Sequence, residues 1–190
     1  MWFYRFAYAL VVPAFRLLYR ARVTGREHVP EGAVLLCANH TALKDPIFAA
    51  MVTGIRRPLS FMAKEELFRI PVIRTLARWV RAFPVARGQS DIAAVRQSVA
   101  VLKDGGRLLI FPDGRRVKSR GESPAQLGAA MIAVRAGVPI LPVYISFPKH
   151  PFRRTSVIVK PPFTPEPHKG GGSGEYYREL TAKIEEAVWT

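Results

Sequence analysis

The sequence predicts an α/β domain with a mostly parallel central sheet flanked by helices. Apolar strand-like runs alternate with helical stretches along most of the chain, which is typical of strand–helix–strand units. The chain has 190 residues, of which 49% are hydrophobic, enough for one substantial core but too little for two full-sized domains. Because ligands of such sheets bind beyond the carboxyl ends of the strands, we expect the functional residues in the loops at that edge.

Each predicted element depends on a local pattern. Aliphatic runs between turn residues predict buried strands, while Pro at a helix start and Gly at a helix end mark helix boundaries. The predicted strands are 33–38, 59–63, 81–85, 107–111, 140–146 and 156–160. The predicted helices are 46–52, 71–79, 90–102, 125–136 and 175–188. The glycine-rich stretch 170–174 predicts a flexible connector before the last helix.

The first 22 residues carry a membrane-surface pattern. They contain three tyrosines, three phenylalanines and a tryptophan but no acidic residue. The uncharged run between Arg5 and Arg16 is ten residues long, whereas roughly 20 are needed to span a bilayer. Arginines follow the aromatic residues, unlike the order in a cleavable signal peptide. We therefore predict an amphipathic, membrane-docking helical segment over 1–22, ahead of an α/β domain over 23–190; the alternative is a first helix packed on the domain core.

The charge predicts an anionic partner. The formal net charge is +15, and 21 of the 29 basic residues are arginines, which suit bidentate contacts with phosphate and carboxylate. Nucleic acid, an anionic lipid surface, a phosphorylated metabolite and an acidic protein all fit such a charge. The arginines are scattered and the aromatic residues gather near the N-terminus, so a nucleic-acid-binding domain is disfavoured. Cys37 is the only cysteine, which excludes an internal disulfide, and we predict no metal site and no cofactor.

His40 and Asp45 form the first candidate catalytic group. An apolar strand delivers His40 into a turn, and a carboxylate follows five residues later. In one continuous helix these side chains would lie on different faces, so they can meet only if a loop folds between them. We expect Asp45 to cap a helix that begins at Pro46 and to face back toward His40. An imidazole held by a carboxylate can act as a general base, although Asp45 could also be only a helix cap.

Two further polar clusters follow predicted strands. The strand over 81–85 leads to Arg87 and Gly88, and the strand over 107–111 leads to Pro112, Asp113, Gly114, Arg115 and Arg116. Taken alone, each could be an ordinary surface turn. Because both follow buried strands, we expect them at the same sheet edge as His40.

At this point the sequence resembles the lysophosphatidic acid (1-acyl-sn-glycerol-3-phosphate) acyltransferases of the glycerolipid acyltransferase superfamily. Four blocks resemble the family's motifs in order, namely its His-x4-Asp block, its arginine-ended block, its Phe-Pro-Glu-Gly-Thr-Arg block and its Pro-containing block. They are 39–45, 83–87, 111–116 and 137–143, and the resemblance extends over about 23–147. It implies that His40 is the catalytic base and Asp45 its partner. It also implies that the substrate phosphate is bound by Arg87 and the third block, with Lys64 as a further candidate; the substrate-binding residues are then Lys64, Arg87, Asp113, Gly114 and Arg116.

The resemblance implies transfer of a fatty acyl chain from an acyl thioester to the sn-2 hydroxyl of lysophosphatidic acid, giving phosphatidic acid in phospholipid biosynthesis. The donor would be acyl-carrier protein or acyl-coenzyme A, and the acceptor a lysophospholipid at an anionic membrane surface. Glycerol 3-phosphate or an ornithine-type lysolipid stays open as another acceptor. The sequence has no Gly-x-Ser-x-Gly elbow, so a direct transfer without a protein nucleophile is expected. The implied location is the cytoplasmic face of the cell membrane, as a peripheral or monotopic protein.

Three positions depart from the family pattern. Asp113 stands where the family has glutamate, and Arg115 stands where it has threonine. Ala42 stands where a serine is common. The first two changes lie in the block that is expected to bind the phosphate, so they bear on substrate affinity.

Overall fold

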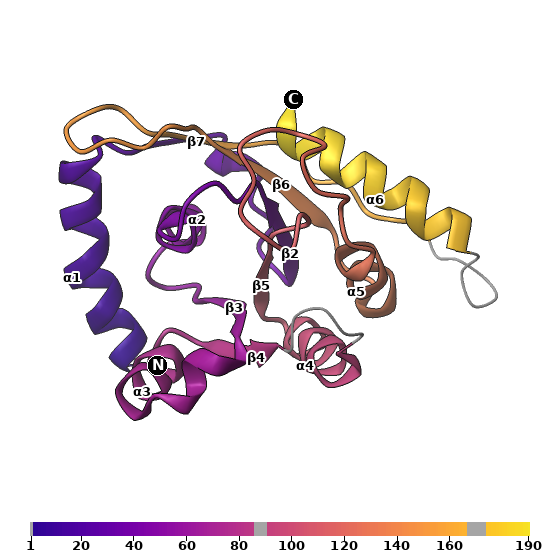
Figure 1. The fold of residues 1–190 in the computed structure, drawn as a ribbon, viewed down its shortest axis with the longest axis horizontal. Coiled ribbons are helices and arrows are strands. Elements are labelled where there is room, and N and C mark those ends of the chain that lie inside the picture. Colours follow the sequence, from indigo (N-terminus) through magenta and orange to yellow (C-terminus); the bar gives the residue numbers. More distant parts are fainter. Residues whose placement is uncertain (1, 86–90, 167–173) are drawn as a thin grey trace.

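One sheet organises the computed structural model, which describes residues 2–85, 91–166 and 174–190 (Figure 1). Within those residues it has seven strands in the order β1-β7-β6-β2-β5-β3-β4. Neighbouring strands are parallel except β6 and β7, which are antiparallel. The strands are β1 (Arg22–Thr24), β2 (Val34–Ala38), β3 (Leu59–Lys64), β4 (Ala82–Val85), β5 (Arg107–Ile110), β6 (Ile140–Ile145) and β7 (Ser156–Val159). The predicted fold class, a mostly parallel sheet flanked by helices, is confirmed.

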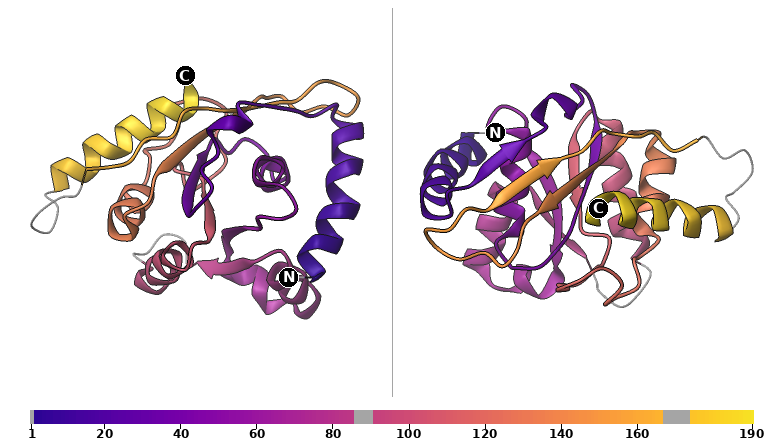
Figure 2. Two further views of the ribbon diagram at one scale, coloured as in Figure 1. Left: turned by 180° about the vertical axis from the view of Figure 1, so that it is seen from behind. Right: turned by 90° about the horizontal axis from the view of Figure 1, so that it is seen from above.

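Helices lie on both sides of this sheet. In Figures 1 and 2, α1, α2 and α3 are on one side and α4, α5 and α6 on the other. The helices are α1 (Trp2–Leu18), α2 (Asp45–Thr53), α3 (Pro71–Trp79), α4 (Ile92–Lys103), α5 (Gly128–Ala136) and α6 (Gly174–Trp189), with the short 3-10 helices η1 (Arg26–His28) and η2 (Glu65–Arg69). This arrangement gives the domain two hydrophobic cores, one on each face of the sheet.

The central strand β2 explains why its sequence is apolar without a break. Val34 and Leu36 face the core that contains α1 and α2, whereas Leu35 and Cys37 face the core that contains α4, α5 and α6. A strand covered on both faces has no polar side, so the run that precedes His40 is continuously hydrophobic. Burial raises the pKa of the Cys37 thiol, which agrees with a structural residue inside the strand.

Helix α1 has two unlike faces. Tyr4 and Val12 are buried, and the backbone N–H of Leu59 in β3 donates to the Tyr4 hydroxyl at 3.4 Å. Trp2, Phe6 and Leu10 are more than half exposed. One face of α1 therefore packs on the core, as in the alternative, and the exposed face is the one to which the predicted membrane docking applies. The docking and the division into 1–22 and 23–190 stay predictions. Across the described ranges, the chain has no helix with the length and apolarity that crossing a membrane requires.

The structure differs from the predicted elements most clearly at β1 and at the start of α5. The strand β1 was not predicted, because it is only three residues long and is defined by its parallel pairing with β7. Helix α5 begins at Gly128 rather than at 125, because the N–H of Gln126 is bonded to the carbonyl of Pro112 at 2.8 Å and holds the preceding residues in a loop. The predicted connector 170–174 lies outside the described residues except for Gly174, the first residue of α6.

Candidate active site

The side chain of Asn39 fixes the point where the chain leaves β2. Its Nδ2 donates to the carbonyl of Ile145 at 2.9 Å, and its Oδ1 accepts the N–H of Ile145 at 2.7 Å. These two bonds continue the pairing of β2 with β6 by one side chain, in the way that a backbone amide would. The next residue, His40, therefore leaves the sheet from a rigid support.

The imidazole of His40 lies against the carboxylate of Asp45. His40 Nδ1 is 3.1 Å from Asp45 Oδ2, and only 8% of the His40 surface is exposed. A face of the ring stacks on Phe111, with centroids 4.1 Å apart and an interplanar angle of 16°. A hydrogen bond from Nδ1 to the carboxylate places the ring proton on Nδ1, so the lone pair of Nε2 is available to accept a proton.

The expectation that Asp45 caps its own helix is wrong, although its carboxylate does face His40. Asp45 is the first residue of α2, because a turn closed by its N–H and the carbonyl of Ala42 already precedes the helix. Its Oδ2 instead accepts the backbone N–H groups of Thr41 and Ala42, both at 2.7 Å. The carboxylate therefore closes the loop that carries His40, and the His-x4-Asp spacing is what this loop requires.

Lys149 holds the other oxygen of the carboxylate. Its Nζ lies 2.9 Å from Asp45 Oδ1 and also donates to the Thr41 hydroxyl, and its side chain is 1% exposed. Burial of the Asp45 carboxyl raises its pKa, but the hydrogen bond from His40 and the charge of Lys149 outweigh that effect and leave the pKa below its ordinary value. Asp45 is thus an ionised partner for the imidazole.

The third block, residues 111–116, and the next residue, Val117, contact His40. Phe111 stacks on the imidazole, and the N–H of Val117 donates to the His40 carbonyl at 2.8 Å. Between them, Gly114 adopts a φ of 64° in a turn closed by its N–H and the carbonyl of Phe111. Arg116, next to Val117, is exposed. The structure therefore brings this basic turn and the His40–Asp45 pair together.

Asp113 is buried and differs from the other residues of the block. It is 2% exposed, and neither of its carboxylate oxygens has a hydrogen-bond partner among the described residues. Burial, together with the charges of Glu185 and Glu122, raises its pKa to about 6. It forms no hydrogen bond with Arg115, whose Nη2 donates to the Glu122 carbonyl at 3.0 Å.

This burial predicts a pH-dependent gain in stability for Asp113→Asn. Because folding raises the pKa of Asp113, the folded protein binds this proton more tightly than the unfolded chain does. The free energy of unfolding therefore falls as the pH rises toward and through 6, where the buried carboxyl ionises. We expect the substitution to stabilise the protein by roughly 1 kcal/mol at pH 7.5 and by little at pH 4, as measured by thermal unfolding. The matched change Asp104→Asn, at the exposed end of α4, should give no such difference between the two pH values.

Lys64 lies at the same sheet edge and Arg87 is outside the described residues. Lys64 ends β3, and because β3 and β5 are parallel neighbours its backbone leaves the sheet beside the third block. Its Nζ pairs with Glu66 at 3.0 Å, and both side chains are about half exposed.

In the described part of the chain, no group of three or more His, Cys, Asp or Glu residues is placed to hold a metal ion.

Sequence reasoning did not find Lys149 or Asn39. Lys149 stands 104 positions after Asp45, as one of eight lysines, and nothing near it in sequence marks it as buried. Asn39 was included in the first block but was given no role. The available signal was a lysine four residues after the end of β6, in a connection that starts at the edge where His40 also lies.

A nearly apolar cavity of about 220 Å³ lies on the side of the sheet that carries α1 and α2. It lies between α1, α2 and β3, and Pro46, the residue after Asp45, is part of its wall. The wall residues include Tyr4, Val12, Ile47 and Phe61. Such a space suits a hydrocarbon chain rather than a polar group.

The structure thus places a buried His–Asp pair at the carboxyl edge of a mostly parallel sheet, in the same domain as a basic turn and an apolar cavity. A family model described as Acyltransferase matches residues 20–146, two thirds of this chain. The chain therefore belongs to the acyltransferase family. The resemblance to 1-acyl-sn-glycerol-3-phosphate acyltransferases that the motifs predict is confirmed by the relatives below.

The names of the known relatives differ in the acceptor. The 1-acyl-sn-glycerol-3-phosphate acyltransferase of Pseudomonas aeruginosa is 29% identical over 127 residues, covering 65% of this chain and 48% of the relative. The lyso-ornithine lipid O-acyltransferase of the same organism is 33% identical over 135 residues, covering 69% and 49%. The crystal structure of the LPA acyltransferase PlsC from Thermotoga maritima has a TM-score of 0.66 and 26% identity, covering 96% of this chain and 80% of that one. The chain thus spans about half the length of the two curated relatives.

Proposed function

We propose that this protein transfers a fatty acyl chain from an acyl thioester to the sn-2 hydroxyl of lysophosphatidic acid and so makes phosphatidic acid. The observation that carries the proposal is the buried His40–Asp45 pair with the third block wrapped around it. Relatives named as acyltransferases of this substrate support it.

The geometry supports a direct transfer. His40 Nε2 takes the proton of the acceptor hydroxyl, and the hydroxyl oxygen attacks the thioester carbonyl to form a tetrahedral oxyanion. The oxyanion collapses, the carbon–sulfur bond breaks, and the imidazolium gives its proton to the departing thiolate. Asp45 holds the imidazole in place and stabilises its charged form during this step.

The basic edge provides contacts for the acceptor phosphate. Arg116 is one residue from the backbone bond that joins Val117 to His40, and Lys64 ends the strand beside the same loop. Arg87 follows β4, the next strand along this edge, and completes the proposed set. A net charge of +15 also favours an anionic donor, either acyl-carrier protein or acyl-coenzyme A.

The apolar cavity suits one acyl chain. Its wall includes Pro46, the residue after Asp45, so a chain held there would lie next to the helix end that carries the catalytic carboxylate. Each buried methylene contributes about 0.8 kcal/mol, so the cavity favours long-chain substrates over short ones.

The proposal is tested by measuring transfer from radiolabelled acyl donor to a panel of acceptors. We expect lysophosphatidic acid to be the preferred acceptor over glycerol 3-phosphate and a lyso-ornithine lipid. Preference for the lyso-ornithine lipid would keep the chemistry and replace the acceptor, as in the second Pseudomonas relative. No transfer to any acceptor would contradict the function itself.

If the basic residues bind the phosphate, their removal affects one substrate selectively. Arg116→Ala and Lys64→Ala should each raise the KM for lysophosphatidic acid by about 10-fold and leave the KM for the acyl donor nearly unchanged, because a charge-assisted bond is lost. Arg135→Ala is the matched control, since this exposed arginine lies in the last turn of α5 on the other side of the sheet. Steady-state kinetics with each substrate varied in turn gives the comparison. Equal effects of all three changes on the KM for lysophosphatidic acid would contradict specific phosphate binding by Arg116 and Lys64 and would indicate that only the overall positive charge matters.

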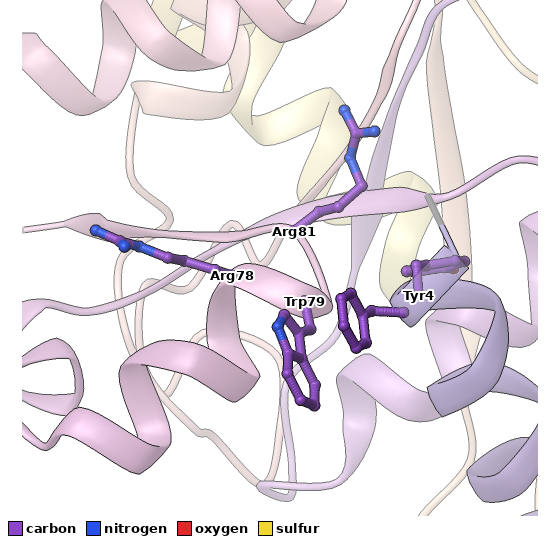
Figure 3. Close-up of a pocket in the computed structure, with 5 residues that line it drawn as sticks. Tyr4, Arg78, Trp79 and Arg81 are labelled. Atoms are coloured by element: carbon purple, nitrogen blue, oxygen red, sulfur yellow. The ribbon is translucent and has the colours of Figure 1, made fainter.

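A surface formed by α1 and α3 supports docking on a membrane. The rings of Phe3 and Trp79 stack 4.3 Å apart, and Figure 3 shows Trp79 and Tyr4 among the residues that line a pocket, with Arg78 directed away from the rings. A pocket of about 170 Å³ lies between these residues. On α3, Val72 and Leu76 are more than half exposed, and they share one face of the helix with Trp79.

This aromatic and basic surface suits the interface of an anionic bilayer, with arginines reaching the phosphates. We propose peripheral attachment at the cytoplasmic face, where acyl donors are soluble. The docking surface lies on the same side of the sheet as the apolar cavity, so a lipid acceptor could enter from the membrane.

A further inference from the structure

Lys149 is a buried cation that the proposed mechanism does not use. It lies in the connection between β6 and β7, and its side chain is 1% exposed. Its ammonium contacts Asp45 Oδ1 at 2.9 Å and the Thr41 hydroxyl. Burying a charge destabilises a protein unless the charge is paired, so the position of this lysine indicates a role for its contact with Asp45.

The Lys149 ammonium contacts two groups, the carboxylate of Asp45 and the hydroxyl of Thr41. Asp45 Oδ2 already has three donors, namely His40 and the N–H groups of Thr41 and Ala42, whereas Oδ1 has only the lysine. The two backbone bonds to Oδ2 close the loop, and the lysine adds one further bond to it, at the Thr41 hydroxyl. What it adds is a positive charge on the side of Asp45 away from the imidazole.

Other charges near this group are few. Lys44 precedes α2 and donates both to the Lys149 carbonyl at 3.2 Å and to the hydroxyl of Tyr19 just beyond α1 at 3.0 Å. The third block meets His40 through Phe111 and Val117, which carry no charge. Among the residues that the structure describes, the groups facing Asp45 are thus His40 and Lys149, with Lys44 behind the lysine.

We propose that Lys149 is a positioning residue that compensates the charge of Asp45 and so favours the neutral, proton-accepting form of the His40 imidazole. An uncompensated carboxylate beside an imidazole favours the imidazolium, which cannot act as a base. The ammonium offsets that pull while Asp45 still orients the ring. This inference rests on the proposed acyl transfer for its kinetic consequence but not for its electrostatic one.

The test compares neutral and charged replacements of the lysine. In Lys149→Met and Lys149→Gln, the acidic limb of the kcat/KM profile should move to higher pH by roughly half to one unit, so activity falls many-fold at pH 6 and little at pH 9. Lys149→Arg keeps the charge and should keep the wild-type profile. Lys160→Met is the matched control, because this part-buried lysine bonds the Ala187 carbonyl far from the site.

A measurement without substrate separates this inference from the proposed function. In the same variants, the pH midpoint of the His40 ring signals in NMR should rise with the neutral replacements and stay constant with arginine. A fall in activity by one factor at every pH, or an unmoved NMR midpoint, overturns the inference and leaves Lys149 as a packing residue. If wild-type protein transfers no acyl group, the proposed function fails, and the NMR midpoint still decides the role of Lys149. If Lys149→Met does not fold, the glutamine variant decides both measurements.

Discussion

His40→Ala should abolish acyl transfer while the protein stays folded. A positioned general base typically contributes about 10²–10⁴-fold, and removing the imidazole takes away both the base and the acid for the departing thiolate. The side chain lies in a loop after β2, and the carboxylate of Asp45 keeps its two backbone N–H donors and Lys149 without it. Asp45→Asn should lose nearly as much activity, because an amide cannot hold the imidazole in the same way. The measurements are single-turnover transfer of a radiolabelled acyl chain and circular dichroism of the same samples.

His28→Ala is the control that separates catalysis from stability. His28 Nδ1 contacts the carbonyl of Val159 at 3.0 Å, so its loss affects packing between η1 and β7 and not the pair. We expect a lower melting temperature with nearly unchanged transfer per folded molecule. Full activity in folded His40→Ala protein would contradict the mechanism. A loss of activity that only follows a loss of fold would indicate a structural histidine.

The sheet and the His40 loop could be predicted because local rules act together there. A strand buried on both faces must be apolar throughout, and the polar residues that end it must lie at the sheet edge. For that reason the sequence places His40 and the third block at one edge, as the structure does. The orientation of the Asp45 carboxylate toward His40 was predicted correctly. Its role as a helix cap was not, because the carboxylate accepts two loop N–H groups instead.

Lys149 could not be predicted, because its position depends on packing between segments far apart in sequence. The β6–β7 connection reaches both the end of α1, through the bond from Thr155 N–H to the Tyr19 carbonyl, and the carboxylate of Asp45 (Figure 1). No periodicity in the sequence records such a contact. β1 escaped prediction for the same reason, since its pairing with β7 defines it. Burial of Asp113 likewise comes from tertiary packing, and the pattern of a turn suggested an exposed residue.

The two faces of α1 make a sharper membrane test than a deletion does. The buried side of the helix carries Tyr4 and Val12, so removing the segment would open the core and confuse docking with unfolding. Trp2, Phe6 and Leu10 recur every four residues on the opposite face and are 68%, 57% and 65% exposed. These three side chains can be changed without touching the core.

Replacing Trp2, Phe6 and Leu10 together by serine should release the protein from vesicles of anionic phospholipid. Each large apolar side chain that enters the interface contributes about 1.5–3 kcal/mol, so the triple variant should bind at least about 100-fold more weakly in sedimentation assays. Its melting temperature should stay near that of the wild type, and transfer to a short-chain, soluble acceptor should persist. Ile92→Ser is the matched control, because this exposed residue starts α4 on the other side of the sheet and should leave binding unchanged. Unaltered sedimentation of the triple variant would mean that the basic surface of the domain, and not this face of α1, holds the protein on the membrane.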